Sequence, residues 1–433
     1  MAKTIEFTEL LSKVQTHLSE HHADALNSSK HYDQIKPYIR HYIRSNALFV
    51  ESMETDEIVD ALYSDMVEYS FLTPYLHRED VDEVNINSWR NVVVTYANGR
   101  KETLRSFYSP IHAEDVIRRM LNESGMTLDN AVPIAEGQLS GINGRITAMK
   151  YPLVDKETHI SASIRLLHPS RITVTNLVSG DSASEEMVRF LCCCMRYGVS
   201  FVVAGATFSG KTTLLNALLK TMPDEKRIFT IENGSRELDL VRKDEEARII
   251  NNVVHTLARK SEKPQQNITM EKLVVAALRF NPDLIVVGEM RDDEAYAAID
   301  ASLTGHTLVS TIHSFEGEEA HMRLATLCQK RFPMELNLSL MQAAKAFPVV
   351  CFEQQLSDGS RKITNISECV LDANGNRDYI TLYRYVVERN EVEDSKTVVY
   401  GHYETVNPMS QHLRERMLMF GIPTSLLAAI DQC

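Results

Sequence analysis

The sequence predicts an α/β fold built around a parallel sheet, and three observations carry this prediction. Apolar runs alternate with helical patterns from about residue 187 to residue 350. One run, "VSFVVAGATFSGKTTLLNALL" from Val199 to Leu219, passes through a loop with two glycines into a helix that begins with Lys211. With 433 residues, 44% of them hydrophobic, the chain is long enough for two or three domains with ordinary cores.

Two segments precede this core. Residues 1–64 are expected to form a helical N-terminal extension, because Leu, Val and Ile recur there at helical spacing. Residues 65–170 are expected to form a smaller mixed α/β domain. Its signals are a strand at Val92–Val94, a hairpin turn at Asn98-Gly99, the helical segment "AEDVIRRMLNESGM" and the alternating strand "HISASIRLL".

Residues 171–186 are polar and rich in Ser and Thr, which predicts a linker. The parallel-sheet core is placed at residues 187–370, with further strands at "RIFTIE", "DLIVVGEM" and "TLVSTIHS" and helices at "TMEKLVVAALRF" and "DDEAYAAIDASL". Near residue 350 the sequence predicts a hairpin with its turn at Asp358-Gly359, and helices after it. Residues 371–433 are assigned to a separate C-terminal segment.

The charge balance of 46 Lys and Arg against 59 Asp and Glu, a formal net charge of -13, argues against direct nucleic-acid binding. The most apolar stretch, "MVRFLCCCMRYGVSFVVAGA", carries Arg189 and Arg196, so a buried helix followed by a strand is expected there rather than a membrane span. The N-terminus is charged and amphipathic, unlike a signal peptide. A cytoplasmic protein is therefore expected. Cys192, Cys193 and Cys194 are expected to be reduced thiols packed in a helix.

The order G-A-T-F-S-G-K-T fits the phosphate-loop pattern, in which successive backbone N–H groups hold phosphate oxygens at the start of a helix. Lys211 is expected to reach the β- and γ-phosphates, and the hydroxyl of Thr212 to bind Mg²⁺. The strand before and the helix after the loop are the context that this motif needs. The predicted nucleotide-binding residues are Gly205, Ala206, Thr207, Phe208, Ser209, Gly210, Lys211, Thr212 and Thr213.

A second signal is "NPDLIVVGEMR", an apolar strand that ends in Glu289. Phosphate-loop enzymes place a metal or water ligand at such a strand end, so Glu289 is expected to polarise the attacking water. Gly288 stands where many NTPases have Asp. The Mg²⁺ carboxylate is therefore assigned to Glu232, at the end of the neighbouring strand.

The third signal is "TGHTLVSTIHS", where His306 and His313 bracket a short apolar strand. Their spacing puts them on opposite faces of a strand, so both are expected at its ends. One of them could sense the γ-phosphate, although a structural role remains the alternative.

The phosphate loop, the acidic segment, "GEMR" and the paired-His segment, in this order, resemble the secretion ATPase superfamily of type II and type IV secretion, type IV pili and conjugation. "VDEVNIN", "SIR" at 163–165, "LRFNPD" and "DGSRKIT" resemble the tight-adherence, CpaF-like branch. The resemblance covers roughly residues 75 to 370. It implies a RecA-like ATPase core with an N-terminal domain, in a homohexamer at the cytoplasmic face of a cell-envelope machine.

The resemblance further implies that the chain hydrolyses ATP with Mg²⁺ and works with inner-membrane platform proteins. It also implies catalytic roles for Glu232, Glu289, His306 and His313. An arginine is expected to complete the site. Arg279 and Arg291 in the core and Arg145 and Arg165 in the N-terminal domain are the candidates, and Arg165 is preferred because it ends a strand close to the linker.

The sequence departs from the family pattern at several positions. The acidic box has Asn233 after Glu232 instead of Asp, Gln138 stands at an Arg position, and the four-Cys zinc knuckle of many type II ATPases is absent, so no zinc is expected. The histidine spacing is closer to the retraction-motor branch. Two other functions stay open at this point: an ATP-gated interaction protein with little turnover, and a DNA-translocating motor, which the acidic charge disfavours.

Overall fold

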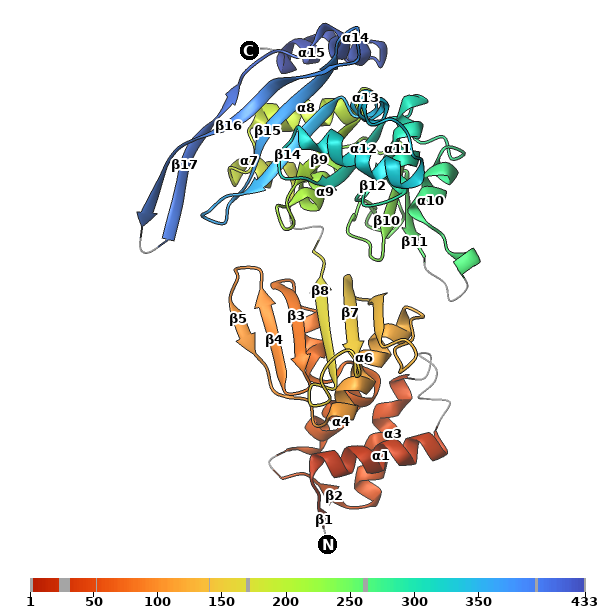
Figure 1. The fold of residues 1–433 in the computed structure, drawn as a ribbon. Helices are drawn as coiled ribbons and strands as arrows, with labels where there is room; N and C mark the ends of the chain where they lie inside the picture. The colour runs from red at the N-terminus through yellow and green to blue at the C-terminus, as the bar shows by residue number, and fades with distance from the viewer. Residues whose placement is uncertain are drawn as a thin grey trace. The chain divides into compact units, whose positions relative to one another are not determined.

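The computed structural model describes residues 3–22, 32–51, 53–139, 141–168, 172–259, 264–393 and 396–431. The chain divides into two compact units, Met1–His168 and Pro169–Cys433 (Figure 1). This division joins the N-terminal extension to the mixed domain, and it joins the predicted linker and C-terminal segment to the core.

The first unit begins with helices and continues with a sheet. Its helices are α1 (Phe7–His21), α3 (Tyr32–Ser45), α4 (Thr55–Val67), α5 (Thr73–Leu76) and α6 (Pro110–Glu123), with the 3-10 turn η2 (Ser70–Leu72). Its strands are β1 (Lys3–Thr4), β2 (Leu48–Phe49), β3 (Val81–Ser88), β4 (Asn91–Tyr96), β5 (Lys101–Thr103), β6 (Ile134–Gln138), β7 (Gly144–Lys150) and β8 (Ile160–Leu166).

Apolar residues four positions apart explain the helices at the start of this unit. Side chains at that spacing share one face of a helix. Leu10, Val14 and Leu18 of α1 are fully buried, and α3 contributes Ile35 and Ile39 to the same core. The helical prediction for this region is therefore confirmed in the part that the structure describes.

β3 to β8 form one antiparallel sheet in the order β5-β4-β3-β8-β7-β6. Alternate residues of β8 are buried, and α6 contributes Val116, Ile117 and Met120 to the core beneath the sheet. The predicted strands, the hairpin at Asn98-Gly99 and the helix are confirmed.

The second unit has more elements. Its helices are α7 (Val174–Ser179), α8 (Glu185–Arg196), α9 (Lys211–Leu219), α10 (Met270–Ala277), α11 (Glu294–Leu303), α12 (Glu319–Arg331), α13 (Leu336–Ala346), α14 (Gln411–Met419) and α15 (Thr424–Ile430), with the 3-10 turn η3 (Pro264–Gln266). Its strands are β9 (Phe201–Gly205), β10 (Ile228–Asn233), β11 (Val253–Ala258), β12 (Leu284–Val287), β13 (Leu308–His313), β14 (Val349–Gln355), β15 (Arg361–Leu371), β16 (Arg377–Glu393) and β17 (Lys396–Thr405).

These nine strands form one sheet in the order β11-β10-β12-β13-β9-β14-β15-β16-β17 (Figure 1). The strands from β11 to β14 are parallel, whereas β15, β16 and β17 join antiparallel. Phe201 and Val203 of β9 pack into the core on the side of α8 and α9, and Val202 and Ala204 into the core on the side of α10 to α13. Because both faces are covered, the central strands are buried along nearly their whole length and are mostly apolar.

The prediction of helices directly after the Asp358-Gly359 hairpin is wrong for residues 377–405. These residues form β16 and β17, a long hairpin that extends the sheet beyond β15 (Figure 1). β16 carries Tyr379, Ile380, Thr381 and Tyr383 at strand positions that pair with β15, and these residue types are typical of strands. The expected helices follow only as α14 and α15.

Candidate nucleotide site

The phosphate loop lies between β9 and α9, as the motif predicts. Gly205 has φ +157 and Gly210 has φ +112. At Gly210 an ordinary side chain would be strained, because this backbone conformation favours glycine. The loop ends in Lys211, whose backbone begins α9, so that the positive end of the helix points at the loop.

Lys211 is only 6% exposed. Its Nζ donates to the carbonyl oxygens of Gly205 at 3.0 Å and Ala206 at 2.6 Å, so the lysine folds back on its own loop. Burial lowers the pKa of Lys211, although Glu289 and Glu353 favour the charged form. An ammonium that is largely buried and has no anionic hydrogen-bond partner in the described residues is well prepared for an anionic ligand.

His313 lies beside this loop because β13 runs next to β9, with His313 in register with Gly205. Its Nδ1 is 3.2 Å from Nζ of Lys211, and its Nε2 is 3.0 Å from Oε1 of Glu289. Burial first, and the charge of Lys211 second, lower the pKa of His313. The imidazole is therefore neutral at pH 7 and accepts from Lys211 through Nδ1.

Glu289 follows the carboxyl end of β12 and faces the same group of residues. Its Oε2 is 2.5 Å from a guanidinium nitrogen of Arg291, and this hydrogen bond raises the pKa of Arg291. Oε1 is buried and, among the residues that the structure describes, has no aligned hydrogen-bond donor, because His313 approaches it without hydrogen-bond geometry. This oxygen therefore keeps its acceptor capacity for a water molecule.

Glu232 lies at the end of β10, and three strand spacings separate β10 from β9 in the sheet. Its Oε1 accepts from the backbone N–H groups of Glu237 at 2.7 Å and Leu238 at 2.9 Å. A Cβ at Gly288 would lie 3.2 Å from its Cγ, so the small residue before Glu289 leaves room for the Glu232 side chain. Burial raises the pKa of Glu232 to about 7.

The residues present fit a nucleotide phosphate with a divalent cation. Within the described part of the chain, Oγ of Ser209 and Oε2 of Glu232 are buried without a hydrogen-bond partner, although buried polar groups are normally paired. Thr212 follows Lys211 in the first turn of α9. Oxygen ligands of this kind suit Mg²⁺, which prefers hydroxyl, carboxylate and phosphate oxygens.

The structure does not bring His306 close to Lys211, His313 and Glu289. His306 precedes β13, whereas Glu289, His313 and the phosphate loop all follow carboxyl ends of parallel strands. It lines a pocket of about 300 Å³ with Arg196, Lys226 and Phe420, at the opposite edge of the sheet. Both histidines do lie at strand ends, as the sequence predicted.

The candidate arginines fall into three places. Arg291 contacts Glu289 directly, as described above, while Arg279 lies just beyond α10. Arg145 and Arg165 belong to the first unit, where they are cross-strand neighbours on β7 and β8.

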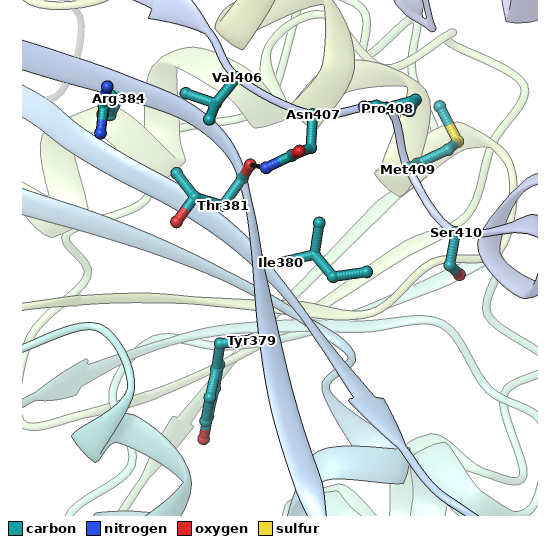
Figure 2. A pocket seen from close by; sticks show the side chains of 9 residues that line it. All are labelled: Tyr379, Ile380, Thr381, Arg384, Val406, Asn407, Pro408, Met409 and Ser410. Carbon is teal, nitrogen blue, oxygen red and sulfur yellow. Dashed lines mark hydrogen bonds between the residues drawn. The ribbon is translucent and has the colours of Figure 1, made fainter.

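A larger pocket of about 590 Å³ lies between β16 and the segment after β17 (Figure 2). Tyr379, Thr381 and Ser410 line it, and the side chain of Asn407 donates to the carbonyl oxygen of Thr381 at 2.9 Å. None of its lining residues belongs to the phosphate loop, so its size does not make it the nucleotide site.

Two residues that lie beside the phosphate loop are not among the site residues predicted from the sequence. Glu353, near the end of β14, is 4% exposed, and Arg361 begins β15. The signal in the sequence is an acid at the end of the apolar run "VVCFE". Only the pairing of β14 with β9 shows that this acid adjoins the loop.

Fold and site together define a P-loop nucleotide-binding protein with a parallel sheet. Residues 112–421 match the family model described as Type II/IV secretion system protein. The chain therefore belongs to this family. In the part of the chain that the structure describes, no helix is both long and apolar enough to cross a membrane.

An uncharacterized protein of Methanocaldococcus jannaschii is 28% identical over 304 residues, which cover 69% of this chain and 53% of that protein. The chain thus spans about half the length of this relative. A putative conjugal transfer protein of Mycobacterium tuberculosis is 27% identical over 273 residues, 61% of this chain and 74% of that protein. The X-ray structure of the Legionella pneumophila ATPase DotB covers 83% of this chain and 84% of its own, with 18% identity and a TM-score of 0.49.

Proposed function

We propose that the protein is an ATP-hydrolysing motor that powers a secretion, pilus-assembly or conjugation machine. The observation that carries this proposal is the contact series Lys211–His313–Glu289 directly beside the phosphate loop. Family membership supports the same function, because residues 112–421 match the secretion system family. A loop that only held nucleotide would not need a half-buried carboxylate with one unpaired oxygen at this place.

In the proposed reaction, Lys211 binds and neutralises the β- and γ-phosphates. Oε1 of Glu289 accepts a proton from the attacking water, while Arg291 and His313 keep the carboxylate in place. Because neutral His313 adds no positive charge next to Lys211, it positions the carboxylate of Glu289 without repelling the Lys211 ammonium. Mg²⁺ supplies charge neutralisation at the phosphates when bound, and Thr212 and Glu232 are the residues assigned to hold it.

The oligomeric state and the partner proteins are proposed on the basis of family membership. We infer a homohexamer that binds inner-membrane platform proteins from the cytoplasmic side, with no direct contact to nucleic acid. The quoted segments "VDEVNIN" and "DGSRKIT" support the tight-adherence, CpaF-like branch. Arg165 of the first unit is proposed to act on a nucleotide held in the second unit of its own or a neighbouring subunit.

The deciding experiment is steady-state ATPase activity of the purified full-length chain with Mg²⁺, measured beside equilibrium ATP binding. Turnover that disappears in Lys211→Ala is the expected result. Tight ATP binding with negligible turnover, even in the presence of candidate platform proteins, would instead support the ATP-gated interaction protein. Strong stimulation by DNA would support the DNA-translocating motor.

A further inference from the structure

Arg361 lies beside the phosphate loop, on the side of β9 that faces away from β13 and His313. β14 is parallel to β9 and pairs with it as far as Ala204. β15 returns antiparallel beside β14 and begins with Arg361, which pairs with Gln355. Because Gln355 lies beyond the part of β14 that pairs with β9, the strand pairing places Arg361 past the carboxyl end of β9, where the phosphate loop begins.

The side chain of Arg361 contacts the phosphate loop directly. Its Nε donates to the carbonyl oxygen of Phe208 at 3.0 Å. Phe208 has φ +65, a left-handed conformation that disfavours bulky side chains, so this bond fixes a strained part of the loop. A Cβ at Gly210 would lie 3.1 Å from Cδ of Arg361, so the aliphatic part of the arginine packs on the second glycine. The guanidinium group is thus held at the loop by two contacts.

The other two nitrogens of this guanidinium group keep their donors for a ligand. Arg361 is exposed, and within the described part of the chain the bond from Nε is its only hydrogen bond and it forms no ion pair. Arg291, by contrast, is already paired with the carboxylate of Glu289. A guanidinium group presents its donors as a planar fork that matches the oxygen atoms of a phosphate. Of these two arginines, Arg361 is therefore the one that fits a phosphate ligand.

The strand order indicates which part of a nucleotide meets Arg361. His313 and Glu289 lie on the β13 and β12 side of β9, and the water assigned to Glu289 attacks the γ-phosphate. A phosphate loop holds the α- and β-phosphates with its backbone N–H groups, while its lysine reaches the β- and γ-phosphates. With the γ-phosphate on the β13 side, the α-phosphate and the nucleoside leave the loop toward β14 and β15. Arg361 lies on that side.

We propose that Arg361 is a nucleotide-binding residue, whose two terminal guanidinium nitrogens donate to the α- and β-phosphates of a bound nucleoside di- or triphosphate. This role rests on nucleotide binding at the phosphate loop, which is part of the function proposed above. Lys211 is the one cation within the loop itself, and Arg361 adds a second cationic side chain from the opposite side. Because ATP and ADP both carry the α- and β-phosphates, the contact stabilises substrate, transition state and product alike.

The test is the equilibrium affinity of the full-length chain for ATP and for ADP, both with Mg²⁺, measured beside the turnover rate at saturating ATP. Arg361→Met removes the charge and the donors but keeps an unbranched side chain. It should weaken the binding of both nucleotides about tenfold. The turnover rate should fall less than about threefold, because a contact that is equally strong in the ground state and the transition state changes affinity alone. Arg361→Lys keeps the charge without the fork and should weaken both nucleotides about threefold.

Arg384→Met is the matched control. Arg384 lies on the neighbouring strand β16 opposite Asn365, and its Nε is 2.8 Å from a carboxylate oxygen of Glu404. It is thus an arginine of the same sheet that is already paired with an acid. Arg384→Met should leave the affinities for ATP and ADP and the turnover rate unchanged.

Three results would overturn the role of Arg361. If Arg361→Met binds ATP and ADP as wild type does, the arginine does not contact the phosphates. If it loses affinity for ATP alone, the contact is with the γ-phosphate. If the turnover rate falls as much as the affinity, Arg361 acts only by shaping the loop through Phe208. Should Arg361→Met fail to fold, the same three comparisons are made with Arg361→Lys.

The same measurements separate this role from the proposed function. A wild type that binds ATP and ADP but does not hydrolyse ATP would contradict the motor, while the affinities of the Arg361 variants would still decide the role of Arg361. A wild type that binds neither nucleotide would overturn both proposals.

Discussion

Nδ1 of His313 lies 3.2 Å from Nζ of Lys211, and this contact joins the histidine segment to the phosphate loop. The other ring nitrogen is 3.0 Å from Oε1 of Glu289. One neutral imidazole therefore contacts both the phosphate-binding cation and the carboxylate assigned to the water. Any change at His313 should affect turnover through both neighbours.

Replacing Lys211 by Ala should reduce ATP turnover by about a hundredfold or more, because the phosphate charge loses its main cationic partner. Steady-state ATPase assays measure this. Lys220, the C-cap residue at the other end of α9, gives a matched lysine control that should leave turnover unchanged. Activity of Lys211→Ala within a few-fold of wild type would mean that the loop is not the catalytic site.

Glu289→Gln should keep ATP binding and lower turnover by about a hundredfold or more, since the amide keeps the shape but cannot act as a base. Glu232→Gln should instead weaken Mg²⁺-dependent binding. ATP affinity with and without Mg²⁺ in both variants separates the two roles. Normal hydrolysis by Glu289→Gln would show that the wrong carboxylate is assigned.

His313→Ala should lower the turnover rate about tenfold or more with a smaller change in ATP affinity, because the methyl group contacts neither Lys211 nor Glu289. His306→Ala is the matched control, since His306 lies at the opposite end of the parallel strands. Equal losses of turnover in both variants would contradict the assignment of His313 as the histidine of the site, and would favour the family-based role for His306.

Specific ATPase activity should fall on dilution if subunits share sites in a hexamer. The rate per subunit is measured across a dilution series, with the mass determined at each point. Arg165→Ala should impair turnover more than ATP binding, because an added arginine acts mainly on the transition state. A monomer that hydrolyses as fast as the assembled form would rule out shared sites.

Gly205→Ala should destabilise the second unit by about 2 kcal/mol or more, because the new methyl group would meet the carbonyl oxygen of Glu353 at 2.2 Å. Urea denaturation measures the loss. Gly234→Ala serves as the comparison, since φ is +78 there but nothing lies within 4 Å of the added Cβ. It should cost only about 1 kcal/mol of backbone strain. Equal losses of unfolding free energy in Gly205→Ala and Gly234→Ala would mean that the contact with Glu353 adds nothing to the cost of the Gly205 substitution.

The sequence by itself determined the parts of the protein that are encoded locally. Two glycines and Lys211 at fixed spacing between an apolar strand and a helix define the phosphate loop, and an acid at the end of a buried strand makes Glu289 the candidate carboxylate. Most strands and helices of the parallel core follow from short-range periodicity. β16 and β17 were missed, although the long hairpin they form extends the same sheet.

Only the tertiary structure decided which strands are neighbours, because pairing across a parallel sheet joins segments far apart in the chain. The strand order puts His313 on one side of Gly205 and Glu353 on the other. The common direction of the parallel strands sends His306 to the opposite edge, although it belongs to the same segment as His313. The chemical groups of the site are thus encoded in local motifs, whereas the strand order determines which of these groups become neighbours.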